Sequence, residues 1–102
     1  MKTTAIALFG SRISPRFDCA QEFMVITSSE NAVTGKHIET IREDMPIMKV
    51  RRLTALKVDT LICGGVDESS REHLLSHGIK ILANKKGEVE ENVSSYITSS
   101  SD

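Results

Sequence analysis

The chain has 102 residues and a mass of 11.2 kDa, enough for one compact domain and too little for a second hydrophobic core. Its 13 basic and 14 acidic side chains give a net charge of −1, so there is no general attraction to nucleic acid or to an anionic lipid surface. No apolar run approaches the roughly 20 residues that a membrane-spanning helix needs. We therefore expect neither nucleic acid nor membrane as a partner, and any electrostatic function must come from local clusters of charge.

The first half of the chain is predicted to form three strands. Residues 5–9 are a short apolar run followed by Gly10, which is typical of a strand buried on both faces. Residues 23–27 have strand composition, and turn-forming residues separate them from the mixed polar and apolar stretch 33–42. This pattern predicts a hairpin whose second strand is a half-exposed edge.

The second half alternates helices with strands. Residues 45–56 carry apolar side chains every three positions with basic residues between them, which predicts an amphipathic helix. The later elements follow from similar signals: a buried strand at 58–63, a helix at 67–77 with Asp67 as its cap and Leu74 and Leu75 on its inner face, a strand at 79–83 and a last helix at 89–97. We expect one α/β domain over residues 1–97, a mixed five-stranded sheet flanked by helices in the order β-β-β-α-β-α-β-α, and a flexible polar tail at 98–102.

The expected topology selects two loops as a candidate site. Strands joined by helices should be parallel, which places strand 58–63 beside strand 5–9, with the hairpin on the other side. Ligands of open α/β sheets bind where the strand order reverses in this way, outside the carboxyl ends of the strands. The loops at that point are 10–20 and 64–67.

These two loops, together with Cys63 at the end of the strand before loop 64–67, contain groups suited to binding an anion or a metal cluster. Arginines can neutralise negative charge, glycines let a ligand approach the backbone, and thiols can ligate metal. The candidate binding residues are Arg12, Ser14, Arg16, Cys19, Cys63, Gly64 and Gly65, with Cys19 and Cys63 as the candidate metal ligands.

Structural explanations compete with each of these roles. A glycine pair after a strand is most often a tight turn, and arginines in loops are usually solvated. Cys63 ends a buried strand and is more typical of a packed small hydrophobe, whereas Cys19 lies in the loop that faces the expected crevice. With no CxxC spacing the two cysteines indicate a reducing compartment, and the first apolar run is short for a signal peptide, so we expect a cytoplasmic protein.

The sequence predicts no catalytic function. The central strands lack the carboxylates that a two-metal nuclease needs, and neither a P-loop nor a GxSxG motif is present. His73 and His77 have the spacing of metal ligands on a helix, but no third ligand accompanies them in the sequence. We therefore expect a binding module rather than an enzyme.

Four segments of the chain together resemble the dinitrogenase iron-molybdenum cofactor biosynthesis family, which includes NifX-like carriers and the C-terminal domain of NifB. They are S-P-x-F-D at 14–18, V-D-x-x-I-C-G-G at 58–65, H-G-I-K-I at 77–81 and G-E-V-E-E at 87–91, and the similarity covers nearly the whole chain. The resemblance implies a ribonuclease H-like sheet without nuclease chemistry. It also implies a nitrogen-fixation accessory role in prokaryotes, in which the protein holds or delivers an anionic metal-sulfur cluster of iron-molybdenum cofactor, iron-sulfur or thiomolybdate type, weakly bound or absent as purified.

Two positions depart from the family pattern. Some members have histidine where this chain has Arg16, which favours charge pairing over ligation, and many have glycine where Lys57 stands. The resemblance implies proteins that donate or accept the cluster as partners, with the chain itself a monomer or a weak homo-oligomer. Two alternatives remain open: a regulator whose same loops bind an anion, a nucleotide or a partner without metal, and a structural domain that associates through the edge strand near His37.

Overall fold

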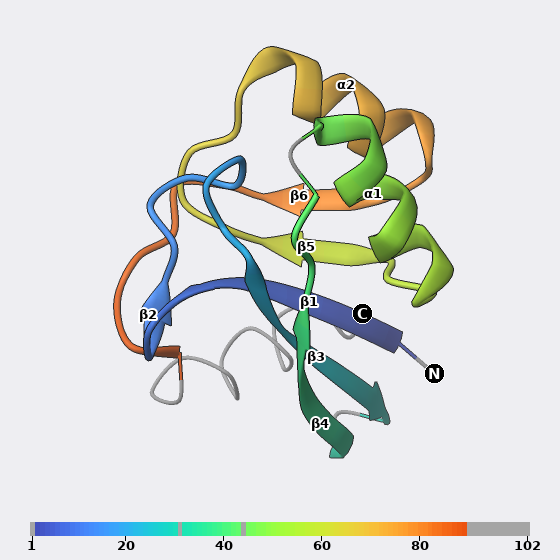
Figure 1. The fold of residues 1–102 in the computed structure, drawn as a ribbon. Coiled ribbons are helices and arrows are strands. Elements are labelled where there is room, and N and C mark those ends of the chain that lie inside the picture. The colour runs from blue at the N-terminus through green and yellow to red at the C-terminus, as the bar shows by residue number, and fades with distance from the viewer. Residues whose placement is uncertain (1, 31, 44, 90–102) are drawn as a thin grey trace.

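The computed structural model describes residues 2–30, 32–43 and 45–89, which form an α/β fold with one mixed sheet and two helices (Figure 1). The sheet has six strands, five of them in the order β4-β3-β1-β5-β6, while β2 pairs with β1 off this path. Apart from Val89, the helix expected at 89–97 and the tail at 98–102 lie outside the described residues. The elements are β1 (Lys2–Phe9), β2 (Arg12–Ile13), β3 (Glu22–Ser29), β4 (Ala32–Thr40), α1 (Pro46–Ala55), β5 (Thr60–Ile62), α2 (Glu68–Ser76) and β6 (Lys80–Leu82).

The reversal of strand order beside the first strand is confirmed. β1 pairs antiparallel with β3 and parallel with β5, and β3 in turn pairs antiparallel with β4. Five strands were expected and the described residues form six, because Arg12 and Ile13 fold back against Phe9 and Leu8 as β2. A two-residue strand has no periodicity for the sequence to reveal.

Side chains alternate along β1, so each face of the sheet has its own core. Ala5 and Ala7 belong to the cluster that α1 and α2 cover, and both helices lie on that face in Figure 1. Ile6 and Leu8 belong to a second cluster on the opposite face. β1 is therefore buried on both faces, as its continuous apolar sequence predicts.

The helices begin and end largely where the sequence indicates, but one side chain faces the other way from expectation. The Asp67 carboxylate caps α2 by accepting from the Ser70 N–H, and Gly78 follows the helix in the left-handed conformation with φ +77°. Leu75, expected on the inner face, is 53% exposed, because it lies about 100° around the helix from the buried Leu74. Lys49, one of the basic residues of α1, is 3% exposed.

The exit from α1 places a lysine in a conformation that favours glycine. Lys57 has φ 63°, in the left-handed region, and its N–H donates to the Thr54 carbonyl at 2.9 Å. This is the position where the family resemblance predicts glycine, so the glycine preference there has a backbone cause. No helix in the described part of the chain is long and apolar enough to cross a membrane.

Candidate functional site

The two loops selected from the sequence lie against each other at the carboxyl ends of β1 and β5. β2 holds the first loop on the β5 side of β1, and Arg16 then forms a parallel bridge with Gly65. Three main-chain hydrogen bonds join the loops: Gly64 N–H to the Ser14 carbonyl at 2.9 Å, Gly65 N–H to the Pro15 carbonyl at 2.6 Å, and Phe17 N–H to the Gly65 carbonyl at 2.9 Å. The loops therefore form one hydrogen-bonded unit, which we call the loop junction (residues 12–19 and 63–65).

Close packing explains why glycine stands at position 64. A Cβ atom on Gly64 would lie 2.5 Å from the Pro15 carbonyl oxygen and 2.6 Å from that of Ser14, and both are backbone atoms. A Cβ on Gly65 would meet its nearest neighbour, the Pro15 oxygen, at 3.4 Å. Since both glycine N–H groups donate to the first loop, these residues bring the loops together, and their amides already have acceptors.

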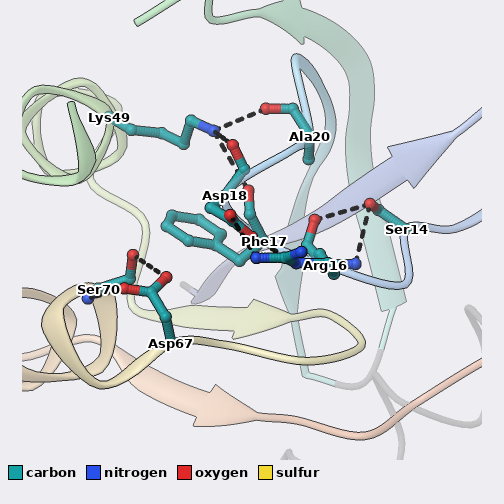
Figure 2. Close-up of polar contacts among 8 residues, drawn as sticks. All are labelled: Ser14, Arg16, Phe17, Asp18, Ala20, Lys49, Asp67 and Ser70. Atoms are coloured by element: carbon teal, nitrogen blue, oxygen red, sulfur yellow. Dashed lines mark hydrogen bonds and ion pairs between the residues drawn. The ribbon is translucent and has the colours of Figure 1, made fainter. Parts of the chain in front are cut away.

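Arg16 projects from the loop junction toward solvent. Its guanidinium forms a bidentate pair with Asp18, with Nε to Oδ1 at 3.1 Å and Nη2 to Oδ2 at 2.8 Å, and its side chain is still 63% exposed (Figure 2). The backbone beneath it is held by the buried Ser14 hydroxyl, which donates to the Arg16 carbonyl at 2.8 Å. The junction therefore presents an exposed guanidinium that is paired with the Asp18 carboxylate.

Asp67 lies within the electrostatic reach of Arg16, at the start of α2. The pKa of its carboxyl is lowered mainly by the hydrogen bond from the Ser70 hydroxyl, at 2.7 Å, with a smaller contribution from the Arg16 charge. Asp67 therefore acts as the helix cap that the sequence predicts, and its negative charge offsets part of the positive field of Arg16.

A buried lysine organises the first loop from behind. Lys49 Nζ donates to three carbonyls of that loop, those of Phe17 at 3.2 Å, Asp18 at 3.0 Å and Ala20 at 2.9 Å (Figure 2). The ammonium also lies 5.2 Å from the centre of the Phe17 ring, which packs edge-on against Phe23 in the core. The loop is thus fastened to α1 through its backbone and to the sheet through Phe17.

Sequence reasoning missed Lys49, although a signal for it exists. Lys49 lies four residues before Leu53 and next to Val50, the two buried apolar residues of α1. It therefore belongs to the apolar stripe of the helix by spacing and departs from it only by residue type. A single lysine on such a stripe, with a polar loop elsewhere in the chain, is the pattern that could have indicated a buried ammonium.

The two thiols lie in different environments, and the expectation that both face one hollow requires correction. Cys63 is fully buried in the core cluster under the helices, and this burial raises the pKa of its thiol to about 11. Cys19 is exposed and lines a cavity of about 270 Å³ at the end of β1, with Phe9, Gly10 and Arg42 among the other lining residues. Cys63 has no free path to an external ligand in this conformation, whereas Cys19 does.

Arg12 lies on the exposed side of β2, at the rim of the loop junction. Its backbone pairs with Phe9 in β1 and with Glu88 in an isolated antiparallel bridge. The neighbouring Ser11 hydroxyl contacts both carboxylate oxygens of Glu88 at 3.1 Å. The structure thus brings Arg16 together with Ser14, Gly64 and Gly65. Arg12 pairs with Phe9, Cys19 lines the cavity at the end of β1, and Cys63 is buried in the core.

The described residues contain no group of three His, Cys, Asp or Glu side chains placed to hold a metal ion. The His77 ring nitrogen Nδ1 lies 2.8 Å from the His73 carbonyl, a contact that belongs to the end of α2. The chemistry offered by the junction is therefore that of guanidinium groups and one exposed thiol.

Comparison with known proteins supports the family resemblance. The family model described as dinitrogenase iron-molybdenum cofactor matches residues 1–99. No curated protein sequence matches the chain significantly.

Solved structures show that the fold is shared. The crystal structure of PH0822 has a TM-score of 0.88 at 16% sequence identity, covering 95% of this chain and 91% of that one. The apo form of the orange protein from Desulfovibrio gigas has a TM-score of 0.79 at 19% identity, covering 97% and 89%. Protein MJ0327 from Methanocaldococcus jannaschii has a TM-score of 0.77 at 21% identity, covering 95% and 88%. With the family model matching almost the whole sequence, the chain belongs to the dinitrogenase iron-molybdenum cofactor family.

Proposed function

We propose that this protein is a non-enzymatic carrier that holds an anionic metal-sulfur cluster as cargo at the loop junction. The observation that carries the proposal is the exposed Arg16 guanidinium, which the hydrogen bonds between the loops hold beside Gly65, where the strand order reverses. Family membership supports the same class of cargo.

Each candidate residue has a role in this proposal that follows from its position. Arg16 and Arg12 supply positive charge at the surface of the junction. Ser14, Gly64 and Gly65 shape the junction, because their hydroxyl and amide groups already bond to the loop backbone. Gly65 is partly exposed and could contact the cargo, whereas Ser14 and Gly64 are buried and would support the loops beneath it.

The exposed thiol is the candidate for direct ligation. A thiolate is the form that binds metal, so a thiol with a pKa of about 11 stays protonated at neutral pH. For this reason we assign the ligand role to Cys19 and a packing role to Cys63.

The cargo is best matched by an assembled cluster, either of iron-sulfur type or containing molybdenum. Guanidinium groups repel a bare metal cation and attract the anionic sulfur surface of a cluster or of thiomolybdate. Such a cargo can be held by charge with one thiolate contact and released again, as a carrier requires. Proteins that donate and accept the cluster in the cytoplasm are the partners this role implies.

Reconstitution tests the proposal directly. The apo-protein is incubated without oxygen with iron, sulfide and thiomolybdate and then desalted, and its bound metal and visible absorbance are measured. We expect the wild type to retain metal. Loss of one contact worth about 1.4 kcal/mol lowers affinity tenfold, so we expect Arg16→Gln and Cys19→Ser each to weaken retention by about that factor.

Arg51→Gln is the matched control, because Arg51 is an exposed arginine of α1 and is not one of the residues of the loop junction. A wild type that retains neither metal nor absorbance would contradict the carrier role. Calorimetry with nucleotides would then test the alternative, a regulator in which Arg16 beside the start of α2 binds phosphate.

A further inference from the structure

Asp18 neutralises the guanidinium that the proposed function assigns to the cargo. Arg16 donates from Nε to Oδ1 of Asp18 at 3.1 Å and from Nη2 to Oδ2 at 2.8 Å, so both carboxylate oxygens are engaged (Figure 2). A guanidinium recognises carboxylates and other anions through the same planar fork of N–H donors. Its other N–H groups can still reach an anion, but that anion meets a neutral pair instead of a full positive charge. An anionic cargo at Arg16 therefore competes with Asp18.

The backbone beneath the pair is held in place. Phe17, between the two charged residues, is fully buried, and its N–H donates to the Gly65 carbonyl at 2.9 Å. The Asp18 carbonyl accepts from the Lys49 ammonium at 3.0 Å. The Arg16 and Asp18 side chains therefore leave an anchored segment on either side of a core residue. Because that segment is already ordered, the pair forms at little further cost in backbone entropy.

Solvent exposure makes the pair exchangeable. The side chains of Arg16 and Asp18 are 63% and 33% exposed, so water screens their attraction. An exposed ion pair of this kind changes the affinity for a competing ligand by at most about fivefold. A ligand that carries several negative charges and makes other contacts can therefore displace the carboxylate.

A second carboxylate near Arg16 is committed to another task. Asp67 accepts from the Ser70 N–H at 3.1 Å and from the Ser70 hydroxyl at 2.7 Å, so it holds the start of α2 and acts on Arg16 only through space. In the described part of the chain the Asp18 carboxylate bonds to the Arg16 guanidinium alone. Of these two carboxylates, Asp18 is thus the one that can exchange with a ligand.

We propose that Asp18 is a release residue, which competes with the cargo for Arg16 and stabilises the cargo-free state of the loop junction. This role rests on the proposed carrier function. When cargo binds, its anionic sulfur atoms replace Asp18 as the counter-charge of Arg16, and when cargo leaves, the carboxylate returns from within the same segment. The competition weakens every anion at Arg16 by a similar factor. A cargo that also contacts Cys19 stays bound, whereas a small anion held by Arg16 alone is excluded.

A double-mutant cycle on cargo retention measures this competition. Apo-proteins are loaded without oxygen with iron, sulfide and thiomolybdate, and the metal that remains bound is measured after desalting. We expect Asp18→Asn to bind the cargo about fivefold more tightly, and to have no effect in an Arg16→Gln background, where its partner is absent. Glu72→Gln removes the same charge at an exposed position of α2 and should behave as the wild type. Circular dichroism establishes that all variants fold.

Inorganic phosphate tests the same pair without cargo, with the NMR signal of the Arg16 Nε–H as the readout. We expect phosphate to shift this signal at about fivefold lower concentration in Asp18→Asn than in the wild type. Equal phosphate responses, or an equal gain in cargo retention with and without Arg16, would overturn the role of Asp18 and leave the carrier function standing. A wild type that retains no cargo would contradict the carrier function, while a phosphate response that depends on Asp18 would still establish the competition.

Discussion

Replacing Gly64 with alanine should destabilise the protein much more than the same replacement at Gly65. The new Cβ would lie 2.5 Å from the Pro15 oxygen and 2.6 Å from the Ser14 oxygen, well inside van der Waals contact. Both are carbonyl oxygens of the loop backbone, so neither can move aside as the end of a flexible side chain would. The two loops must separate to admit the methyl group.

The cost can be worked from the contacts that separation removes. Overpacking a close contact costs about 1 to 3 kcal/mol. The hydrogen bonds from Gly64 N–H at 2.9 Å and Gly65 N–H at 2.6 Å lie on either side of the clash, and each contributes about 0.5 to 1.5 kcal/mol net. If the loops separate, the clash is relieved but the hydrogen bonds weaken. We therefore expect Gly64→Ala to lower the free energy of unfolding by about 2 to 4 kcal/mol.

Urea denaturation followed by far-UV circular dichroism gives this quantity, and the melting temperature should fall by roughly 10 to 20 °C. At Gly65 the nearest neighbour of the new Cβ is at 3.4 Å, and its φ lies outside the left-handed region, so Gly65→Ala should cost less than about 1 kcal/mol. Equal losses at both positions would refute the explanation that close approach of the two loops requires Gly64.

Three further predictions concern the groups around the junction. Lys49→Met should lower the free energy of unfolding by about 2 to 4 kcal/mol, because three loop carbonyls lose their shared donor, and it should speed the alkylation of Cys19. Arg51→Met, at an exposed position of the same helix, is the control. Equal stability of the two variants would contradict the role of Lys49 in fastening the loop. Iodoacetamide at neutral pH should modify Cys19 in the folded protein and Cys63 only after unfolding, because Cys63 is buried and burial raises the pKa of its thiol to about 11. Mass spectrometry of peptides identifies the modified thiol, and modification of Cys63 in the folded protein would contradict the prediction. Folding lowers the pKa of Asp67, so the stabilisation by its charge is fully present above the unfolded pKa near 4 and is lost as the pH falls through the folded pKa. Asp67→Asn should therefore lose less stability than the wild type on acidification. Urea denaturation at several pH values measures this, and parallel curves for the two proteins would count against it.

Much of the fold could be predicted from local pattern. The continuous apolar run of β1 predicts a strand with two buried faces, and the mixed composition of β4 predicts an exposed edge. Asp67 and Gly78 mark the ends of α2 by capping chemistry that acts within a few residues. These signals are short in range, so a single sequence carries them completely.

The loop positions could also be predicted, because right-handed crossovers leave few places for strand 58–63 to pair. Such crossovers place Arg16 and Gly65 at the same end of the sheet, and the parallel bridge between these residues confirms that placement. The family resemblance, on motifs that span both loops, suggested the class of cargo that we propose.

The directions of individual side chains required the tertiary structure. From the sequence alone Cys19 and Cys63 are both thiols next to the expected crevice, and Lys49 is one basic residue among several on α1. The structure buries Cys63 and Lys49 and exposes Cys19, because burial depends on which atoms of distant segments fill the remaining space. Sequence spacing determined which loops meet; packing between α1, the first loop and the core decided which of their groups reach solvent and can touch a ligand.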